Sequence, residues 1–153
     1  MTAAPEFEGA TLQLRRVVAA PRAAVFRAWT DPDWLRQWFG GGSALRADLD
    51  VRVGGEYRIE MKSNLGAGRV FGTYLEVEPP ERLVYTFCWD ALPVRIPETR
   101  VTVEFHERDS ATEVVITHER QPSRRVRDFH QWGWTQSLDS LAGMLEALVN
   151  ERT

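Results

Sequence analysis

Residues 123–150, SRRVRDFHQWGWTQSLDSLAGMLEALVN, carry the only long helical pattern in the sequence. On a helical wheel of about 3.6 residues per turn, one arc is mostly apolar and the opposite arc is polar. The first arc holds Val126, His130, Trp134, Ser137, Leu138, Leu141, Met144, Leu145 and Leu148, and the second holds Asp128, Thr135, Asp139, Glu146 and Asn150. The pattern therefore predicts a long helix that buries one face.

The two halves of the buried arc differ in composition. The second half is aliphatic and predicts plain core, whereas the first half carries His130, Trp134 and Ser137. A few polar groups among apolar rings are typical of a ligand site. Gly133 is expected to let the helix approach the sheet closely. We therefore predict that any functional cavity lies near the start of this helix.

The chain ahead of this helix alternates mostly with the two-residue period of strands. Pro21 and Pro32 suit the first turns of two short helices, and the glycines at 40–42 end the second one. Turn residues separate the remaining alternating segments. Together with a first strand they predict about seven strands in an antiparallel meander, at residues 11–19, 43–51, 54–63, 68–78, 82–90, 99–107 and 111–119. The longest interruption is predicted to be a loop at residues 90–97.

These patterns predict an α+β fold in which a curved antiparallel sheet grips the long helix. We expect one domain over residues 1–153, which is long enough to bury a core of its own. The formal net charge of −3 gives no general attraction to nucleic acid or to anionic lipid. No stretch is apolar enough to span a bilayer, and the start lacks the features of a signal peptide. We expect a cytoplasmic protein with neither a nucleic acid nor a membrane as partner.

The sequence carries no motif for metal or covalent chemistry. His106, His118 and His130 lie on different predicted elements, so no local spacing indicates metal ligands. Nucleophile-elbow, Walker and dinucleotide-binding motifs are absent from the sequence. Cys88 lies in an apolar strand pattern and is expected to be a buried, reduced thiol. We expect no metal, no cofactor and no catalytic residue that a motif would define.

Large aromatic side chains are more numerous than simple filling of such a fold requires. The excess predicts an aromatic-lined interior for a small apolar ligand, although a tightly packed core would use the same residues. A slip of one residue in any strand would exchange its lining residues for outward ones. Alternation and the helix arc select as the expected lining Trp38, Tyr57, Met61, Phe71, Phe87, Trp89, Phe105, His118, His130, Trp134 and Ser137.

Arginines crowd the start of the long helix, at Arg120, Arg124, Arg125 and Arg127. The amino-terminal end of a helix already presents positive partial charge, so acidic residues would be the stabilising choice there. The presence of arginines in place of acidic residues would be explained by a negatively charged group bound near Arg124, Arg125 and Arg127. This group could belong to an acidic partner, such as a chaperone surface, or to an anionic ligand. Solvated surface arginines are the alternative interpretation.

Several strings appear along the chain in an order that matches a known family: LRRVVAAPRAAVFRAWTDPDWLRQWFGG, DVRVGGEYRIEM, GTYLEVEPPERLVYTFCW, VTVEF, EVVITH and HQWGWTQSLDSLAGML. This order resembles the activator of heat shock protein 90 ATPase homologue family, within the START-related superfamily of helix-grip domains. The resemblance covers nearly the whole chain. It implies a curved sheet around the carboxy-terminal helix, two short helices after the first strand, and a cavity between sheet and helix.

The resemblance implies three kinds of function. Bacterial members of the family look like domains that bind hydrophobic molecules, and binding of a small apolar or aromatic ligand is the leading hypothesis. The superfamily also holds polyketide cyclases and aromatases, so an enzyme of that kind, or a hydrolase, could use His118 or His130 to transfer a proton. The third hypothesis is a co-chaperone-like interaction module, or a homodimer built on Phe129 and Trp132. Whether the chain is a monomer or a homodimer stays open.

Overall fold

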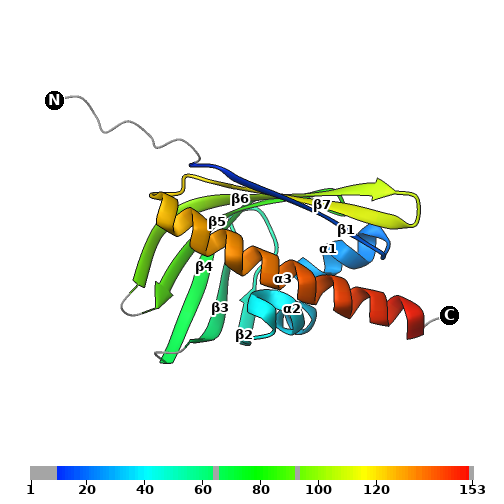
Figure 1. The fold of residues 1–153 in the computed structure, drawn as a ribbon, viewed down its shortest axis with the longest axis horizontal. Helices are drawn as coiled ribbons and strands as arrows, with labels where there is room; N and C mark the ends of the chain where they lie inside the picture. Colours follow the sequence, from blue (N-terminus) through cyan, green and yellow to red (C-terminus); the bar gives the residue numbers. More distant parts are fainter. Residues whose placement is uncertain (1–9, 64–65, 92–93, 152–153) are drawn as a thin grey trace.

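The computed structural model describes residues 10–63, 66–91 and 94–151. These residues form one antiparallel sheet of seven strands in the order β1-β7-β6-β5-β4-β3-β2 (Figure 1). The predicted meander is confirmed, and the first strand joins it by pairing with the last. The strands are β1 (Leu12–Val18), β2 (Ala44–Leu49), β3 (Glu56–Ser63), β4 (Gly66–Glu78), β5 (Arg82–Ala91), β6 (Val94–Arg108) and β7 (Ala111–Glu119).

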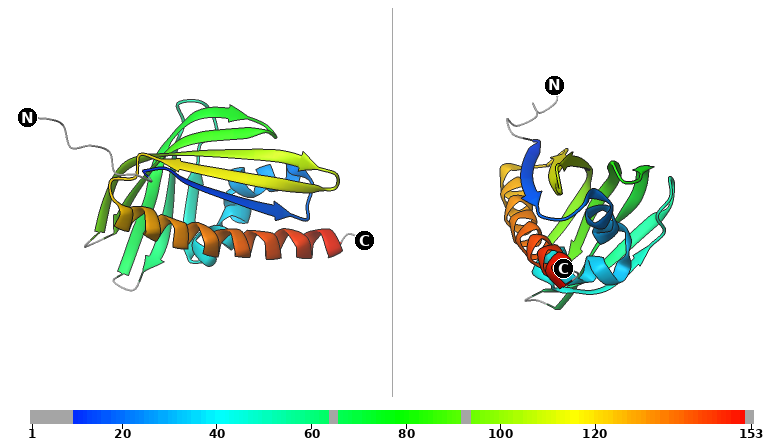
Figure 2. Two further views of the ribbon diagram at one scale, coloured as in Figure 1. Left: turned by 45° about the horizontal axis from the view of Figure 1, so that its top comes forward. Right: turned by 90° about the vertical axis from the view of Figure 1, so that its right-hand side faces the viewer.

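The helices lie on the inner side of the curved sheet. They are α1 (Arg22–Thr30), α2 (Pro32–Trp38), the 3-10 turn η1 (Phe39–Gly41) and the long helix α3 (Arg124–Glu151). The sheet wraps around α3, with α1 and α2 between the sheet and the carboxy-terminal half of that helix (Figures 1 and 2). This is the predicted arrangement, in which a sheet grips one long helix.

The two short helices begin and end where the sequence predicts. The carboxylate of Asp31 caps α2 by accepting hydrogen bonds from the backbone N–H groups of Asp33 at 3.0 Å and Trp34 at 3.4 Å. The glycine run 40–42 then takes φ angles of 63°, 69° and 90°, which residues with a side chain rarely adopt. The chain can therefore turn sharply from α2 into β2.

Side chains alternate across the strands, so one face of the sheet meets the helices. On β1 this inner face carries Leu12, Leu14, Arg16 and Val18. The guanidinium of Arg16 donates a hydrogen bond of 2.6 Å to the carboxylate of Asp139 on α3. The aliphatic half of α3 is core, as predicted, with Leu138, Leu141 and Leu145 buried.

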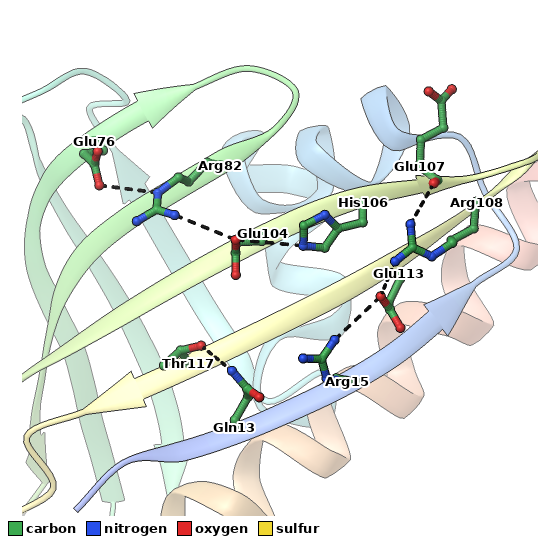
Figure 3. A network of polar contacts seen from close by, with 10 residues as sticks. All are labelled: Gln13, Arg15, Glu76, Arg82, Glu104, His106, Glu107, Arg108, Glu113 and Thr117. Atoms are coloured by element: carbon green, nitrogen blue, oxygen red, sulfur yellow. Dashed lines mark hydrogen bonds and ion pairs between the residues drawn. The ribbon is translucent and has the colours of Figure 1, made fainter.

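The outer face of the sheet is charged and faces water. Arg82 contacts the carboxylates of Glu76 at 3.4 Å and Glu104 at 3.8 Å, and Arg108 contacts Glu113 at 2.8 Å (Figure 3). Exposed ion pairs of this kind contribute about 0–1 kcal/mol each. They suit a solvated surface and contribute little to stability, so the packing that stabilises the fold lies on the inner face.

Residues 90, 91 and 94–97 are strand, so the predicted loop was wrong there, and residues 92 and 93 lie outside the described residues. β5 continues to Ala91 and β6 already begins at Val94. The ladder between them is irregular, since Phe87 pairs with Thr99 whereas Trp89 pairs with Ile96. A bulge at this point accommodates Pro97, because a missing backbone N–H is tolerated where the ladder is interrupted.

Candidate ligand-binding site

A cavity of about 420 Å³ lies between the first half of α3, the η1 turn and strands β3, β4 and β5. This volume falls within the range of small-molecule pockets, roughly 300–1,000 Å³. Phe129 is 43% exposed and Trp132 is 64% exposed, so the cavity opens to solvent beside them. The lining is Phe39, Gly40, Ser43, Met61, Lys62, Val70, Phe87, Trp89, Phe129, His130, Trp132, Gly133, Trp134 and Ser137.

The interior at the other end of the molecule is filled. The ring centroids of Trp29 and Trp38 lie 4.4 Å apart, and Trp29 meets Phe105 edge-on at 5.4 Å. Tyr57 and Tyr85 border a residual space of about 20 Å³, which is close to the room that one water needs. The predicted division is confirmed: the space opens at the His130 end of the helix and the other end is packed.

The η1 turn is fastened to α3 at the edge of the cavity. The backbone N–H of Gly40 donates to Oγ of Ser137 at 2.9 Å, and Oγ of Ser43 donates to the carbonyl of Gly40 at 2.7 Å. Gly40 takes a φ of 63°, and an added Cβ would also press on the end of the Met61 side chain, so the turn favours glycine there. These contacts fix one wall of the cavity.

Gly133 does not serve close packing, contrary to the prediction. A Cβ added at this position would meet no atom of the described residues within 4 Å. The residue instead belongs to the cavity lining. Its missing side chain contributes open space, not a close approach of helix and sheet.

His118 lies behind the cavity wall, fully buried, with both ring nitrogens engaged. The hydroxyl of Thr99 donates its only hydrogen to the carbonyl of Phe87 at 2.7 Å, so Thr99 must accept the hydrogen bond of 2.7 Å from Nε2 of His118. The indole N–H of Trp134 donates to Nδ1 of His118 at 3.1 Å. Both contacts require the same neutral tautomer, with the proton on Nε2.

His130 is stacked on His118 and has a different set of partners. Their ring centroids lie 4.3 Å apart. The side-chain amide of Gln121 donates to the carbonyl of His118 at 3.4 Å, which turns its Oε1 toward Nδ1 of His130 at 2.7 Å. Nδ1 therefore carries the proton and donates it. Nε2 of His130 is buried and has no hydrogen-bond partner among the described residues.

Both histidines are neutral at physiological pH. Burial lowers the pKa of His118 well below its ordinary value of 6.5, and the neighbouring His130 lowers it further. Burial alone lowers the pKa of His130 to about 4. Lys62 is the one charged residue in the described lining. The cavity is thus an uncharged aromatic space with one lysine at its edge.

Six of the residues predicted to line a cavity do line it: Met61, Phe87, Trp89, His130, Trp134 and Ser137. Trp38 and Phe105 are buried in the packed core, where the indole N–H of Trp38 donates to the carbonyl of Ala28 at 2.8 Å. Tyr57 is also buried outside this cavity, and its hydroxyl donates to the carbonyl of Thr86 at 2.6 Å.

Phe71 lies on the other face of β4 and is not brought to the cavity. Its neighbour Val70 and the residue Tyr74 are buried on the inner face, so alternation turns Phe71 outward. There the guanidinium of Arg69 lies 5.2 Å from the centre of its ring. The prediction assigned the wrong face of this strand.

The lining also includes residues that the sequence did not single out for it, among them Phe39, Ser43, Lys62 and Val70. Phe129 and Trp132, which the sequence suggested only as a surface for a homodimer, border the cavity mouth. On the helical wheel Phe129 lies just outside the predicted apolar arc, whereas Trp132 falls in the polar arc beside Asp139 and Asn150, so the wheel carried no signal for Trp132. Lys62 and Ser43 had no such signal, because a strand pairing and a turn bring them there.

The arginines at the start of α3 lie apart from the cavity lining. Arg124 and Arg125 are exposed, and Arg127 contacts the carboxylate of Asp128 at 3.3 Å. Binding of an acidic partner there stays a prediction. Within residues 10–63, 66–91 and 94–151, the structure shows no group of three or more residues that could hold a metal ion. In the same ranges, none of the helices has the length and apolar character needed to cross a membrane.

Cys88 is only half-buried, so the expectation of a buried thiol holds in part. Burial raises the pKa of its thiol, and the negative charge of Glu98 raises it further. The thiol therefore stays protonated, as a structural cysteine does.

The curved antiparallel sheet, the two short helices after β1 and the cavity beside a long carboxy-terminal helix define a helix-grip domain. Residues 19–146 match the family described as Activator of Hsp90 ATPase homolog 1-like protein, and the chain belongs to that family. No curated protein matches the chain.

Solved structures of similar proteins support the fold. An uncharacterised protein from Rhizobium leguminosarum is 30% identical with a TM-score of 0.79, over 90% of this chain and 94% of its own. A protein from Chromobacterium violaceum is 30% identical with a TM-score of 0.78, over 89% of this chain and 96% of its own. DynU16, a protein in the dynemicin biosynthetic locus, is 25% identical with a TM-score of 0.73, over 89% of this chain and 47% of its own.

Proposed function

We propose that the protein binds a small, largely apolar or aromatic molecule in the cavity at the start of α3. The observation that carries this proposal is the contrast within one interior. About 420 Å³ is left open among aromatic side chains at the His130 end, whereas about 20 Å³ is left among those at the Tyr85 end. Because the cavity is open to solvent, an apolar ligand releases the water that contacts its aromatic walls, and the burial of that apolar surface favours binding.

The ring-rich lining suits an aromatic ligand. Phe87 and Trp134 lie 6.1 Å apart between ring centroids, and Trp89 and Phe129 lie 6.0 Å apart. Rings at such separations leave faces and edges available to a third ring, and each good aromatic pair contributes about 0.5–1.5 kcal/mol beyond its buried area. The likeness to DynU16, a protein in a biosynthetic locus, is compatible with a ligand from small-molecule biosynthesis.

Proton-transfer catalysis is the less favoured function. His118 has both ring nitrogens in hydrogen bonds with Thr99 and Trp134, so it has none to offer a substrate. His130 has a pKa lowered to about 4 by burial. A general base works best when its pKa lies near the working pH, so His130 is a weak base at neutral pH. The geometry favours binding over the cyclase-like alternative.

The test uses the open space at Gly133. Gly133 lines the cavity, and an added Cβ there meets no atom of the described residues within 4 Å, so we expect Gly133→Leu to fold while its side chain reduces the binding volume. Native mass spectrometry with a lipid and polyketide panel would find ligands of the wild-type protein. We expect the affinity of Gly133→Leu for any such ligand to fall about tenfold or more, since bound atoms must give way to the leucine.

Gly143→Leu is the matched control. Gly143 lies on the same helix, is exposed, and likewise has no atom of the described residues within 4 Å of an added Cβ. Both variants gain helix propensity of roughly 0.5–1 kcal/mol, so both should be at least as stable as the wild type. Equal affinities in the two variants would contradict the proposed site.

A further inference from the structure

We propose that the ligand carries a hydroxyl or N–H group that donates a hydrogen bond to Nε2 of His130. This inference rests on the proposed binding function and names the chemistry that the cavity recognises. It follows from Nε2 of His130, which has no hydrogen-bond partner among the described residues although the polar side chains beside it all have one.

The network around His130 fixes its protonation state without reference to any ligand. Gln121 is buried and its amide can take only one orientation, because the opposite one would set its oxygen against the carbonyl oxygen of His118. In the allowed orientation Oε1 of Gln121 faces Nδ1 of His130 at 2.7 Å. Nδ1 must therefore be the donor, and Nε2 is left as a bare acceptor.

The unused acceptor belongs to a residue that borders the cavity, and Nε2 itself is covered by neighbouring atoms, so a ligand reaches it by displacing them. His130 is 5% exposed and belongs to the cavity lining, and Nε2 has no partner among the described residues. The polar side chains beside it, Thr99, His118 and Trp134, all have partners. A buried acceptor without a donor is costly, so a donor delivered by a ligand gains more there than it would in water.

The surroundings also limit the charge of that donor. Lys62 is the one charged residue in the described lining, so a cationic ligand would meet a like charge and no carboxylate. A carboxylate or ketone oxygen aimed at Nε2 would set two acceptors against each other. The chemistry that fits is a neutral alcohol, a phenol or an aromatic N–H, carried on an apolar body.

The experiment compares a naphthol, its methyl ether and naphthalene by isothermal titration calorimetry at neutral pH. These probes share one aromatic body, and only the naphthol can donate. We expect the wild-type protein to bind the naphthol about tenfold more tightly than the ether or the hydrocarbon. The preference should disappear in His130→Phe, which keeps a ring and removes the acceptor.

A second measurement keeps the inference testable if His130→Phe does not fold. The side-chain ¹⁵N spectrum of the wild-type protein reports Nε2 of His130 as an unprotonated nitrogen, and its signal should shift on addition of the naphthol and not of the ether. If all three probes bind equally and the signal does not move, the inference is overturned while the binding function stands. If none of the three binds, both are overturned for aromatic ligands of this size.

Discussion

Trp29 and Tyr85 form a buried polar contact whose removal should be costly. The indole N–H of Trp29 donates to the hydroxyl of Tyr85 at 3.2 Å, and both side chains are almost fully buried. In Tyr85→Phe the buried indole N–H would lose its acceptor. We expect the free energy of unfolding to fall by about 1–3 kcal/mol, measured by urea denaturation.

Thr135→Val is the control for this measurement. The hydroxyl of Thr135 donates to the carbonyl of Gln131 at 2.8 Å on the exposed side of α3. Water can replace that contact, so the change in stability should stay within about 0.5 kcal/mol. An unfolding free energy of Tyr85→Phe equal to that of the wild type would show that the indole finds another acceptor.

Lining residues were predicted both on the long helix and on strands, where Met61, Phe87 and Trp89 also line the cavity. His130, Trp134 and Ser137 were predicted from the arc of one helix, and all three line the cavity. Phe71 was placed by strand alternation, which says which residues share a face and not which face is buried. The unpartnered nitrogen of His130 could not be predicted, because Gln121 reaches it through tertiary packing and not through a local spacing.

The start of α2 depends on one side chain. Asp31 accepts hydrogen bonds from two backbone N–H groups that would otherwise have no partner in the helix. We expect Asp31→Ala to lower the free energy of unfolding by about 1 kcal/mol in thermal or urea denaturation. The loss should not alter ligand binding directly, since Asp31 does not line the cavity.

Asp31→Asn separates the cap from the charge. Asparagine caps helices about as well as aspartate, so this variant should keep most of the stability that Asp31→Ala loses. Equal losses in both variants would instead assign the effect to the negative charge, which also contacts the guanidinium of Arg27 at 3.2 Å.

Whole elements were predicted better than their connections. The helical pattern at residues 123–150 corresponds to α3 (Arg124–Glu151), because a long amphipathic period is a local signal. The loop predicted at residues 90–97 was wrong, because the two prolines there suggested an interruption. The bulge that accommodates Pro97 depends on the pairing of β5 with β6, which no local pattern in either strand reveals.

The molecule as a whole joins a closed core to an open cavity along one helix. The aliphatic half of α3 packs with β1, α1 and α2, and its first half borders the cavity together with η1. A side chain added at Gly133 can therefore change binding without entering the core. The same division places the two buried histidines at the cavity end, where their protonation couples stability to pH.

Stability should fall as the pH drops from 7 to 5. Burial holds the pKa of His118 well below 6.5 and that of His130 at about 4, whereas in the unfolded chain both should titrate near 6.5. Below that pH the unfolded state binds protons that the folded state does not, so acid favours unfolding. Each histidine then lowers the free energy of unfolding by up to about 1.4 kcal/mol for each pH unit. Urea denaturation at a series of pH values would measure this decrease.

His130→Phe tests the assignment of this dependence to the histidine pair. Phenylalanine keeps a ring of similar shape and cannot bind a proton, so the slope of unfolding free energy against pH should fall to roughly half of the wild-type slope. His118 should account for the remainder. The measurements should stay above pH 5, because carboxylates begin to protonate below that pH and also change the free energy of unfolding. An unchanged slope in the variant would show that His130 already binds its proton in the folded protein near pH 6.5, and its Nε2 would then be a donor under those conditions.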